Sequence, residues 1–163
     1  MKKVAIIMGS ASDREAVLPA AKQLKELGVP FEWRIMSAHR TPDAAAEFSA
    51  RARENGFGAI IAAAGMAAHL AGAAAARTTL PVIALPLRGG MLDGLDALLA
   101  SVQMPPGIPV ATVAVGGAKN AALLACQILS VEDKELAEKL DALRREAADT
   151  IAQKDKELQR QDI

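Results

Sequence analysis

The sequence predicts an α/β fold in which a parallel sheet of five strands carries helices on both faces, as in flavodoxin-like and Rossmann-like proteins. Two observations predict it. Short, uninterrupted apolar runs alternate along the chain with segments of helical periodicity. Glycine or capping residues separate the two kinds of segment. Strands of this composition are buried on both faces, and ligands of such folds bind at the carboxyl ends of the strands.

The first strand and helix lie at the amino terminus. The apolar run Lys3–Met8 ends at Gly9, as a buried strand followed by a turn does. Ser12 and Glu15 match a capping box, in which each side chain bonds the other's backbone amide. We expect the helix to end at Gly28.

The second unit begins with a strand over Val29–Met36. Thr41 is placed to cap the following helix, and Pro42 suits its first turn. This helix is expected to end at Asn55–Gly56. The apolar run Ala59–Ala63 then predicts the third strand.

Three further segments complete the sheet. After a turn at Gly65–Leu70, an alanine-rich helix is expected to about Arg77. Val82–Leu85 predicts the fourth strand, and Val110–Val115 predicts the fifth, after the proline-rich loop Gln103–Gly107. The whole chain, 1–163, is interpreted as one domain with a core over 1–130.

A helical extension is predicted over 131–163. Ser130–Asp133 is a second capping signal, and the helix that follows is expected to reach about 28 residues, or roughly 40 Å. Apolar residues keep to one of its faces: Leu136, Leu140, Leu143, Ala147, Ile151 and Leu158. An apolar helix face about as long as the whole domain can hardly be covered by one subunit. This favours packing on a neighbouring subunit over a monomer.

Composition narrows the range of functions. Acidic and basic residues balance at 19 each, and aromatic residues make up 2%, so we expect no nucleic-acid partner. No apolar run is long enough to cross a membrane, and a signal-peptide core is missing, so we expect a cytoplasmic protein. Two distant histidines and one cysteine offer no usual metal-ligand spacing, so we expect no metal. Cys126, in an apolar run, is interpreted as a buried core residue.

Four loops are expected to meet at the carboxyl edge of the sheet: Gly9–Asp13, Ser37–Thr41, Ala64–His69 and Pro86–Asp93. The first loop offers backbone amides, the hydroxyls of Ser10 and Ser12 and the carboxylate of Asp13. These groups suit the phosphate and the sugar hydroxyls of a ribose phosphate. Ordinary helix capping by Ser12 is the alternative interpretation.

The second loop combines His39 and Arg40. An imidazole exchanges protons near neutral pH, and a guanidinium holds a phosphate or carboxylate through parallel hydrogen bonds. The alternative is a solvent-exposed histidine and a surface arginine. His69, flanked by alanine and leucine, is interpreted either as a buried, hydrogen-bonded histidine or as part of the site.

Five motifs, in order and across almost the whole chain, resemble one family. They are Met8–Asp13, Ser37–Pro42, Gly65–Leu70, Ser101–Pro105 and Lys119–Leu124. Together they closely resemble the class I 5-(carboxyamino)imidazole ribonucleotide mutases of purine biosynthesis. The resemblance implies a flavodoxin-like three-layer sandwich, a homo-octamer, and catalysis without a metal or other cofactor.

The resemblance also implies roles for individual residues. His39 is the general acid and base, and Ser10, Asp13 and Arg40 bind the ribonucleotide. Ser12 and Ser37 help to shape the site, and Gly65 and His69 lie in the loop around the migrating carboxylate. The implied reaction moves that carboxylate from the exocyclic nitrogen to the imidazole carbon, through released carbon dioxide.

The chain departs from the commonest family pattern in two loops. Ala63, Met66 and Ala71 stand where glycine, glycine and proline are expected, and Arg88–Gly90 replaces a run of small, hydroxyl-bearing residues. Two alternatives stay open: a carboxylase that uses free carbon dioxide, and a non-catalytic ribonucleotide-binding module. Arg40 directly after His39 favours the mutase, because the carboxylase branch tends to have lysine there.

Overall fold

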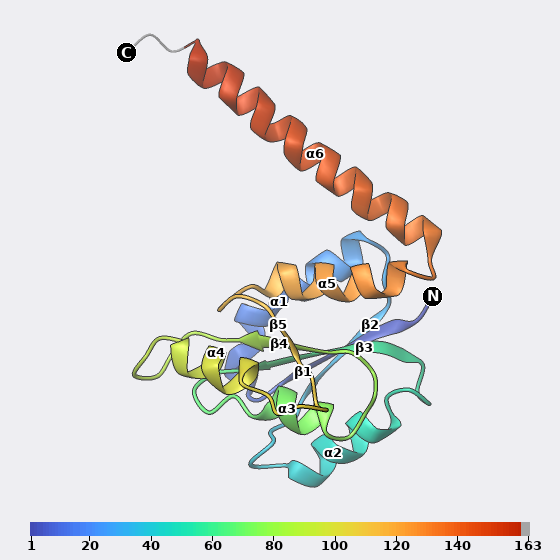
Figure 1. Ribbon diagram of the computed structural model, residues 1–163, viewed down its shortest axis with the longest axis vertical. Coiled ribbons are helices and arrows are strands. Elements are labelled where there is room, and N and C mark those ends of the chain that lie inside the picture. The colour runs from blue at the N-terminus through green and yellow to red at the C-terminus, as the bar shows by residue number, and fades with distance from the viewer. Residues whose placement is uncertain (161–163) are drawn as a thin grey trace.

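The computed structural model describes residues 1–160, and its centre is a parallel sheet of five strands (Figure 1). The strands are β1 (Lys3–Met8), β2 (Phe31–Ile35), β3 (Phe57–Ala64), β4 (Val82–Pro86) and β5 (Ala111–Thr112). Their order in the sheet is β2-β1-β3-β4-β5, which is the flavodoxin-like order. The predicted fold class is therefore confirmed, and the point where the order reverses lies between β1 and β3.

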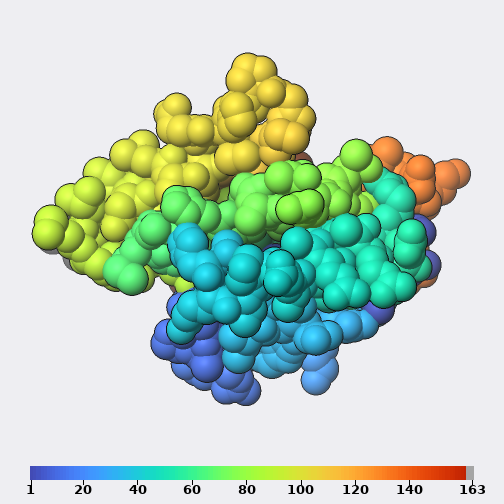
Figure 2. Space-filling model, turned by 90° about the horizontal axis from the view of Figure 1, so that it is seen from below, coloured from blue at the N-terminus to red at the C-terminus, as the bar shows by residue number. Residues whose placement is uncertain are grey.

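Helices cover both faces of the sheet. They are α1 (Arg14–Glu26), α2 (Pro42–Arg51), α3 (Leu70–Ala75), α4 (Leu95–Val102), α5 (Ala118–Ser130) and α6 (Lys134–Gln159), with a 3₁₀ turn η1 (Ala11–Asp13) before α1. In Figure 1, α1 and α5 lie on one side of the sheet and α2 and α3 on the other. Figure 2 looks onto the second side, where α2 (cyan) and α3 (green) lie together.

Alternate residues of the strands pack into two separate hydrophobic cores, one on each face of the sheet. In β1, Val4 and Ile6 face α1 and α5, whereas Ala5 and Ile7 face α2 and α3. All four side chains are fully buried, as the continuous apolar runs predict. Cys126 of α5 belongs to the first core, and burial raises the pKa of its thiol to about 11.

The fifth strand is shorter than predicted. Only Ala111–Thr112 pairs regularly with β4, although the expected strand ran over Val110–Val115. The chain still follows β4 further, because the Val113 amide donates to Ala84 O and the Gly116 amide to Pro86 O. The prediction located the strand correctly, but an edge position leaves it free to lose regular pairing after two residues.

Two of the predicted helix caps are wrong. The capping box at the first helix consists of Ser10 and Asp13, because η1 starts the helical path before Ser12. At the last helix the cap is Asp133, whose carboxylate accepts the Leu136 amide (3.1 Å).

The predicted cap of α2 is also wrong in its chemistry. Pro42 begins this helix as expected, and Thr41 precedes it. The Thr41 hydroxyl, however, turns back: it accepts the Ser37 amide (2.9 Å) and donates to Ser37 O (3.2 Å). The Thr41 side chain therefore bonds the backbone of the preceding loop and makes no capping hydrogen bond to the helix.

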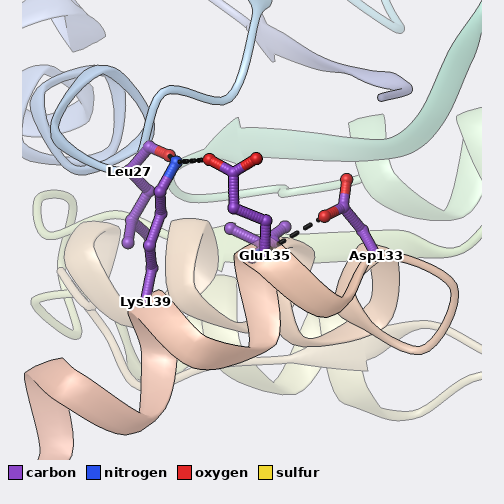
Figure 3. A network of polar contacts seen from close by, with 5 residues as sticks. Leu27, Asp133, Glu135 and Lys139 are labelled. Atoms are coloured by element: carbon purple, nitrogen blue, oxygen red, sulfur yellow. Dashed lines mark hydrogen bonds and ion pairs between the residues drawn. The ribbon is translucent and has the colours of Figure 1, made fainter.

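The long carboxy-terminal helix is confirmed, with 26 residues and a length of about 39 Å. Only its first turns pack on the core, through the buried Leu136 and Leu140. Figure 3 shows how Lys139 fixes this end: its ammonium pairs with Glu135 (2.7 Å) and donates to Leu27 O (3.4 Å). The stretch 144–160 is exposed and projects away from the sheet (Figure 1).

Within residues 1–160, no helix is both long and apolar enough to span a lipid bilayer.

Candidate active site

A cavity of about 650 Å³ lies at the carboxyl edge of the sheet. The loops after β1, β2, β3 and β4 supply its walls, which confirms that the four predicted loops converge. Its lining includes seven of the eight residues predicted for the site: Ser10, Ser12, Asp13, Ser37, His39, Arg40 and Gly65. His69 joins this group through a direct contact with His39.

The loop after β1 is held by its own side chains. The Asp13 carboxylate accepts the Ser10 amide (2.9 Å), and the Ser10 hydroxyl oxygen accepts from the Ser12 hydroxyl (2.9 Å) and amide (3.3 Å). Burial raises the pKa of Asp13, while the hydrogen bonds from Ser10 and Ser12 and the positive charge of Arg40 act in the opposite direction. A carboxylate therefore sits beside two hydroxyls, ready to accept a further donor such as a sugar hydroxyl.

The loop after β2 is a tight turn organised by Ser37. Its hydroxyl oxygen accepts the backbone amides of Arg40 (3.1 Å) and His39 (3.3 Å). The Arg40 guanidinium reaches across to the first loop and donates to Gly9 O (2.7 Å). Ser37 thus orients the two functional residues, and Arg40 joins the ends of β1 and β2.

The two histidines form a pair. His39 Nε2 lies 2.7 Å from His69 Nδ1, and the ring planes meet at 81°. Because both nitrogens must share one hydrogen, one ring donates and the other accepts. His69 is exposed and precedes α3, so its position at the site replaces the alternative interpretation of a buried core histidine.

The loops after β3 and β4 form the opposite wall. Met66 has a left-handed backbone (φ 49°), an uncommon conformation for a non-glycine residue, and is 61% exposed. Arg88 lies two residues after the end of β4, lines the cavity, and donates from Nη1 to Asp93 Oδ2 (2.7 Å). Arg88 lies in one of the four loops expected at this edge, but it was not among the predicted site residues, although an arginine in a loop after a strand is the same signal that indicates Arg40.

A second, larger cavity of about 860 Å³ lies at the other end of the sheet, next to the start of β4. Its walls carry Arg53, Glu54 and Arg77, and neither of the two histidines. The smaller cavity is the candidate active site, because it combines His39, which contacts His69, with hydroxyls and a guanidinium. Among residues 1–160, no three His, Cys, Asp or Glu side chains gather into a metal-ligand set.

A doubly wound sheet with two contacting histidines, serine hydroxyls and a guanidinium at its carboxyl edge is typical of an α/β enzyme. Comparison with known proteins gives the family. The model of the AIR carboxylase family matches residues 3–150, and the chain belongs to this family.

Named relatives are similar over most of their length. The chain is 52% identical to an N5-carboxyaminoimidazole ribonucleotide mutase of Bacillus subtilis, over 95% of this chain and 97% of the relative. It is 54% identical to a protein of the same name from Pyrococcus abyssi, over 88% and 83%. The crystal structure of Treponema denticola PurE superposes with a TM-score of 0.88 at 33% identity, covering 96% of this chain and 98% of that one.

Proposed function

We propose that the protein is an isomerase that converts N5-carboxyaminoimidazole ribonucleotide into 4-carboxy-5-aminoimidazole ribonucleotide in purine biosynthesis. Relatives that carry the mutase name are about half identical over almost the whole chain. The observation that carries the proposal is the contact of 2.7 Å between His69 and His39, which lines a cavity together with Arg40.

Binding of the ribonucleotide is assigned to the first two loops. The hydroxyls of Ser10 and Ser12 and the Arg40 guanidinium offer donors to the phosphate. The Asp13 carboxylate offers an acceptor to the sugar hydroxyls. Ser37 supports this arrangement by holding the amides of the turn that carries Arg40.

His39 is the proposed acid and base. It protonates the carbamate nitrogen, the nitrogen–carbon bond breaks, and carbon dioxide is released inside the cavity. The electron-rich imidazole carbon then attacks the carbon dioxide, and His39 recovers the proton that leaves this carbon. Protons and electron pairs balance, since one proton is given and one is recovered.

The histidine pair gives His69 a part in these steps. A proton that leaves one ring can be replaced through the contact with the other ring, so His69 sets which nitrogen of His39 carries the proton. Gly65, in the same loop, contributes a wall without a side chain near the released gas. Retention of that gas supplies the proximity that free solution lacks.

The family description names the activity of one alternative, a carboxylase that takes free carbon dioxide, although the relatives with the mutase name do not favour it. The origin of the carboxylate distinguishes the two enzymes. The carbamate substrate, labelled with ¹³C in its carboxylate, is given to the enzyme in buffer with unlabelled bicarbonate, and product is analysed by mass spectrometry beside an enzyme-free control.

A mutase passes the label to the product with little dilution. Full dilution of the label, together with efficient turnover of 5-aminoimidazole ribonucleotide and carbon dioxide, identifies the carboxylase. Binding of either ribonucleotide without turnover identifies a non-catalytic binding module.

Assembly as a cytoplasmic homo-octamer belongs to the same proposal. It is supported by the resemblance to the family and by apolar side chains exposed on the projecting part of α6, where Ile151 is 67% and Leu158 66% exposed. Light scattering tests it: the full chain should have eight times the monomer mass, and deletion after Leu143 should lower that mass. A monomeric full-length chain contradicts the proposal.

A further inference from the structure

The cavity contains a second guanidinium, that of Arg88, on the wall opposite Arg40. This inference rests on the proposed function, whose substrate and product each carry two anionic groups, a phosphate and a carboxylate. We propose that Arg88 binds the migrating carboxylate, while Arg40 serves the phosphate end of the ligand. Arg88 is then a specificity-determining residue that separates carboxylated from uncarboxylated ribonucleotides.

The order of the strands separates the two arginines. Arg40 follows β2 and Arg88 follows β4, so three strand spacings, or about 14 Å, lie between the strand ends that carry them. The guanidinium of Arg40 donates to Gly9 O (2.7 Å) at the end of β1, which is two strand spacings, or about 10 Å, from the end of β4. The two charges therefore address opposite ends of an elongated ligand.

The reacting atoms lie between these two ends. His69 follows β3, which is the neighbour of β4, and its ring meets His39 over the cavity. A carboxylate that leaves or joins the base beside this pair is one strand spacing, about 5 Å, from the strand that carries Arg88. Among the cavity-lining residues, Arg88 is the cation on that side.

Asp93 orients the Arg88 side chain but occupies only one of its hydrogen-bond donors. Its Nη1 donates to Asp93, yet the two side chains are 71% and 67% exposed, so solvent screens the pair and it is weak. A guanidinium has five N–H donors, and the remaining ones can form a bidentate pair with a carboxylate.

The loops on either side of Arg88 fit closely together. A Cβ atom at Gly90 would lie 2.9 Å from Met66 Cγ, so the Met66 side chain lies directly against this glycine. A Cβ atom at Gly94 would lie 3.2 Å from Leu87 O and 3.4 Å from Arg88 Cα. Both contacts fix the backbone that carries Arg88. In Figures 1 and 2 this loop, coloured yellow-green, extends at one end of the molecule.

The test compares two ligands that differ in the carboxylate. Calorimetry measures binding of 4-carboxy-5-aminoimidazole ribonucleotide and of 5-aminoimidazole ribonucleotide to the wild type, Arg88→Ala, Arg88→Lys and Asp93→Asn. Arg77→Ala, at an exposed arginine outside this cavity, is the matched control. Circular dichroism verifies the fold of each variant.

Arg88→Ala should weaken binding of the carboxylated ligand roughly tenfold, as expected for loss of a charged hydrogen-bond partner, and should leave the other ligand within about twofold. The affinity of Arg88→Lys for the carboxylated ligand should lie between those of the wild type and Arg88→Ala. Lysine keeps the positive charge but cannot form the two parallel hydrogen bonds of a guanidinium. Asp93→Asn should show a loss of about two- to threefold for the same ligand only.

Two results overturn the inference: equal losses for both ligands, which assign Arg88 to the phosphate, and unchanged binding of both. Failure of the proposed function is measured separately, because the label experiment on the wild-type enzyme reports the reaction, whereas these variants report only the difference in affinity between the two ligands.

Discussion

The two halves of the active site are built by different means. In the half after β1 and β2, side chains bond backbone amides: Asp13 holds Ser10, and Ser37 holds His39 and Arg40. In the half after β3 and β4, the chain turns through left-handed residues, among them Met66 and Asp93. The first half is held by hydrogen bonds that fix the reactive groups, whereas the second is held by backbone shape and close packing. Substitutions of the hydrogen-bonded residues in the first half should therefore act mainly on binding and turnover, whereas substitutions of the closely packed glycines in the second half should act mainly on stability.

The largest expected effect breaks the chemistry of the first half. His39→Asn keeps a similar volume and removes the proton transfer, so turnover should fall at least about a hundredfold while ribonucleotide binding and the melting temperature are kept. Steady-state kinetics and calorimetry measure the two quantities. Near-normal turnover in the folded variant rules out His39 as the acid and base.

Next in size is the loss of the guanidinium that joins the ends of β1 and β2. Arg40→Ala should weaken binding of any ligand with a ribose phosphate by about 1.5 to 3 kcal/mol, the usual contribution of a charged hydrogen-bond partner. Arg51→Ala, at an exposed arginine of α2, is the control. An unchanged dissociation constant for Arg40→Ala makes this residue a surface charge only.

The second half should respond through stability. Gly90→Ala introduces a Cβ atom 2.9 Å from Met66 Cγ at φ 70°, and should destabilise the fold by about 2 kcal/mol, from backbone strain and overpacking together. Gly56→Ala is the control, because its φ of 83° is similar and its Cβ atom would meet nothing within 4 Å; we expect about 1 kcal/mol.

Urea unfolding measures both substitutions. Adding Met66→Ala to Gly90→Ala should recover part of the difference, because the contact with Met66 is then removed, whereas the contact of 3.2 Å with Asp96 Oδ2 remains. An equal loss of unfolding free energy in Gly90→Ala and Gly56→Ala shows that the contact between Met66 and Gly90 is unimportant for stability.

The smallest expected effect concerns the pH dependence of the first half. Burial raises the pKa of Asp13 above its value in the unfolded chain. As pH rises between these two values, the unfolded state has released this proton while the folded state keeps it, so the contribution of Asp13 to stability falls; above both values it is constant.

Asp13→Asn imitates the neutral carboxyl at every pH. Its stability relative to the wild type should therefore increase as pH rises through that window and then stay level, in melting curves recorded from about pH 3.5 to 7. A relative stability that decreases over the same window contradicts the raised pKa.

Sequence patterns predict the first half of the site better than the second. Strand ends, capping residues and a histidine–arginine pair are local signals, so the loops that carry Ser10, Asp13, His39 and Arg40 could be located before the structure was known. The capping residues are not predicted correctly. A 3₁₀ turn begins the helical segment two residues earlier than expected, so Ser10 and Asp13 form the capping box in place of Ser12 and Glu15.

The second half depends on information that the sequence carries only weakly. Methionine rarely adopts a left-handed backbone, so nothing local indicates the turn at Met66. The contact of Met66 with Gly90 joins two loops that are distant in sequence and meet only once the sheet has formed. The distance between His39 and His69 likewise follows from the strand order, which places β2, β1 and β3 side by side.

The burial of Cys126 has a practical consequence for the study of α6. The chain contains one cysteine, and at neutral pH its buried thiol is protonated and shielded from reagents. A cysteine introduced at an exposed position, such as Ile151, would then be the single reactive thiol in the protein. A fluorophore or spin label attached there would report the surroundings of the projecting helix, and label-to-label distances between copies would map how the subunits meet.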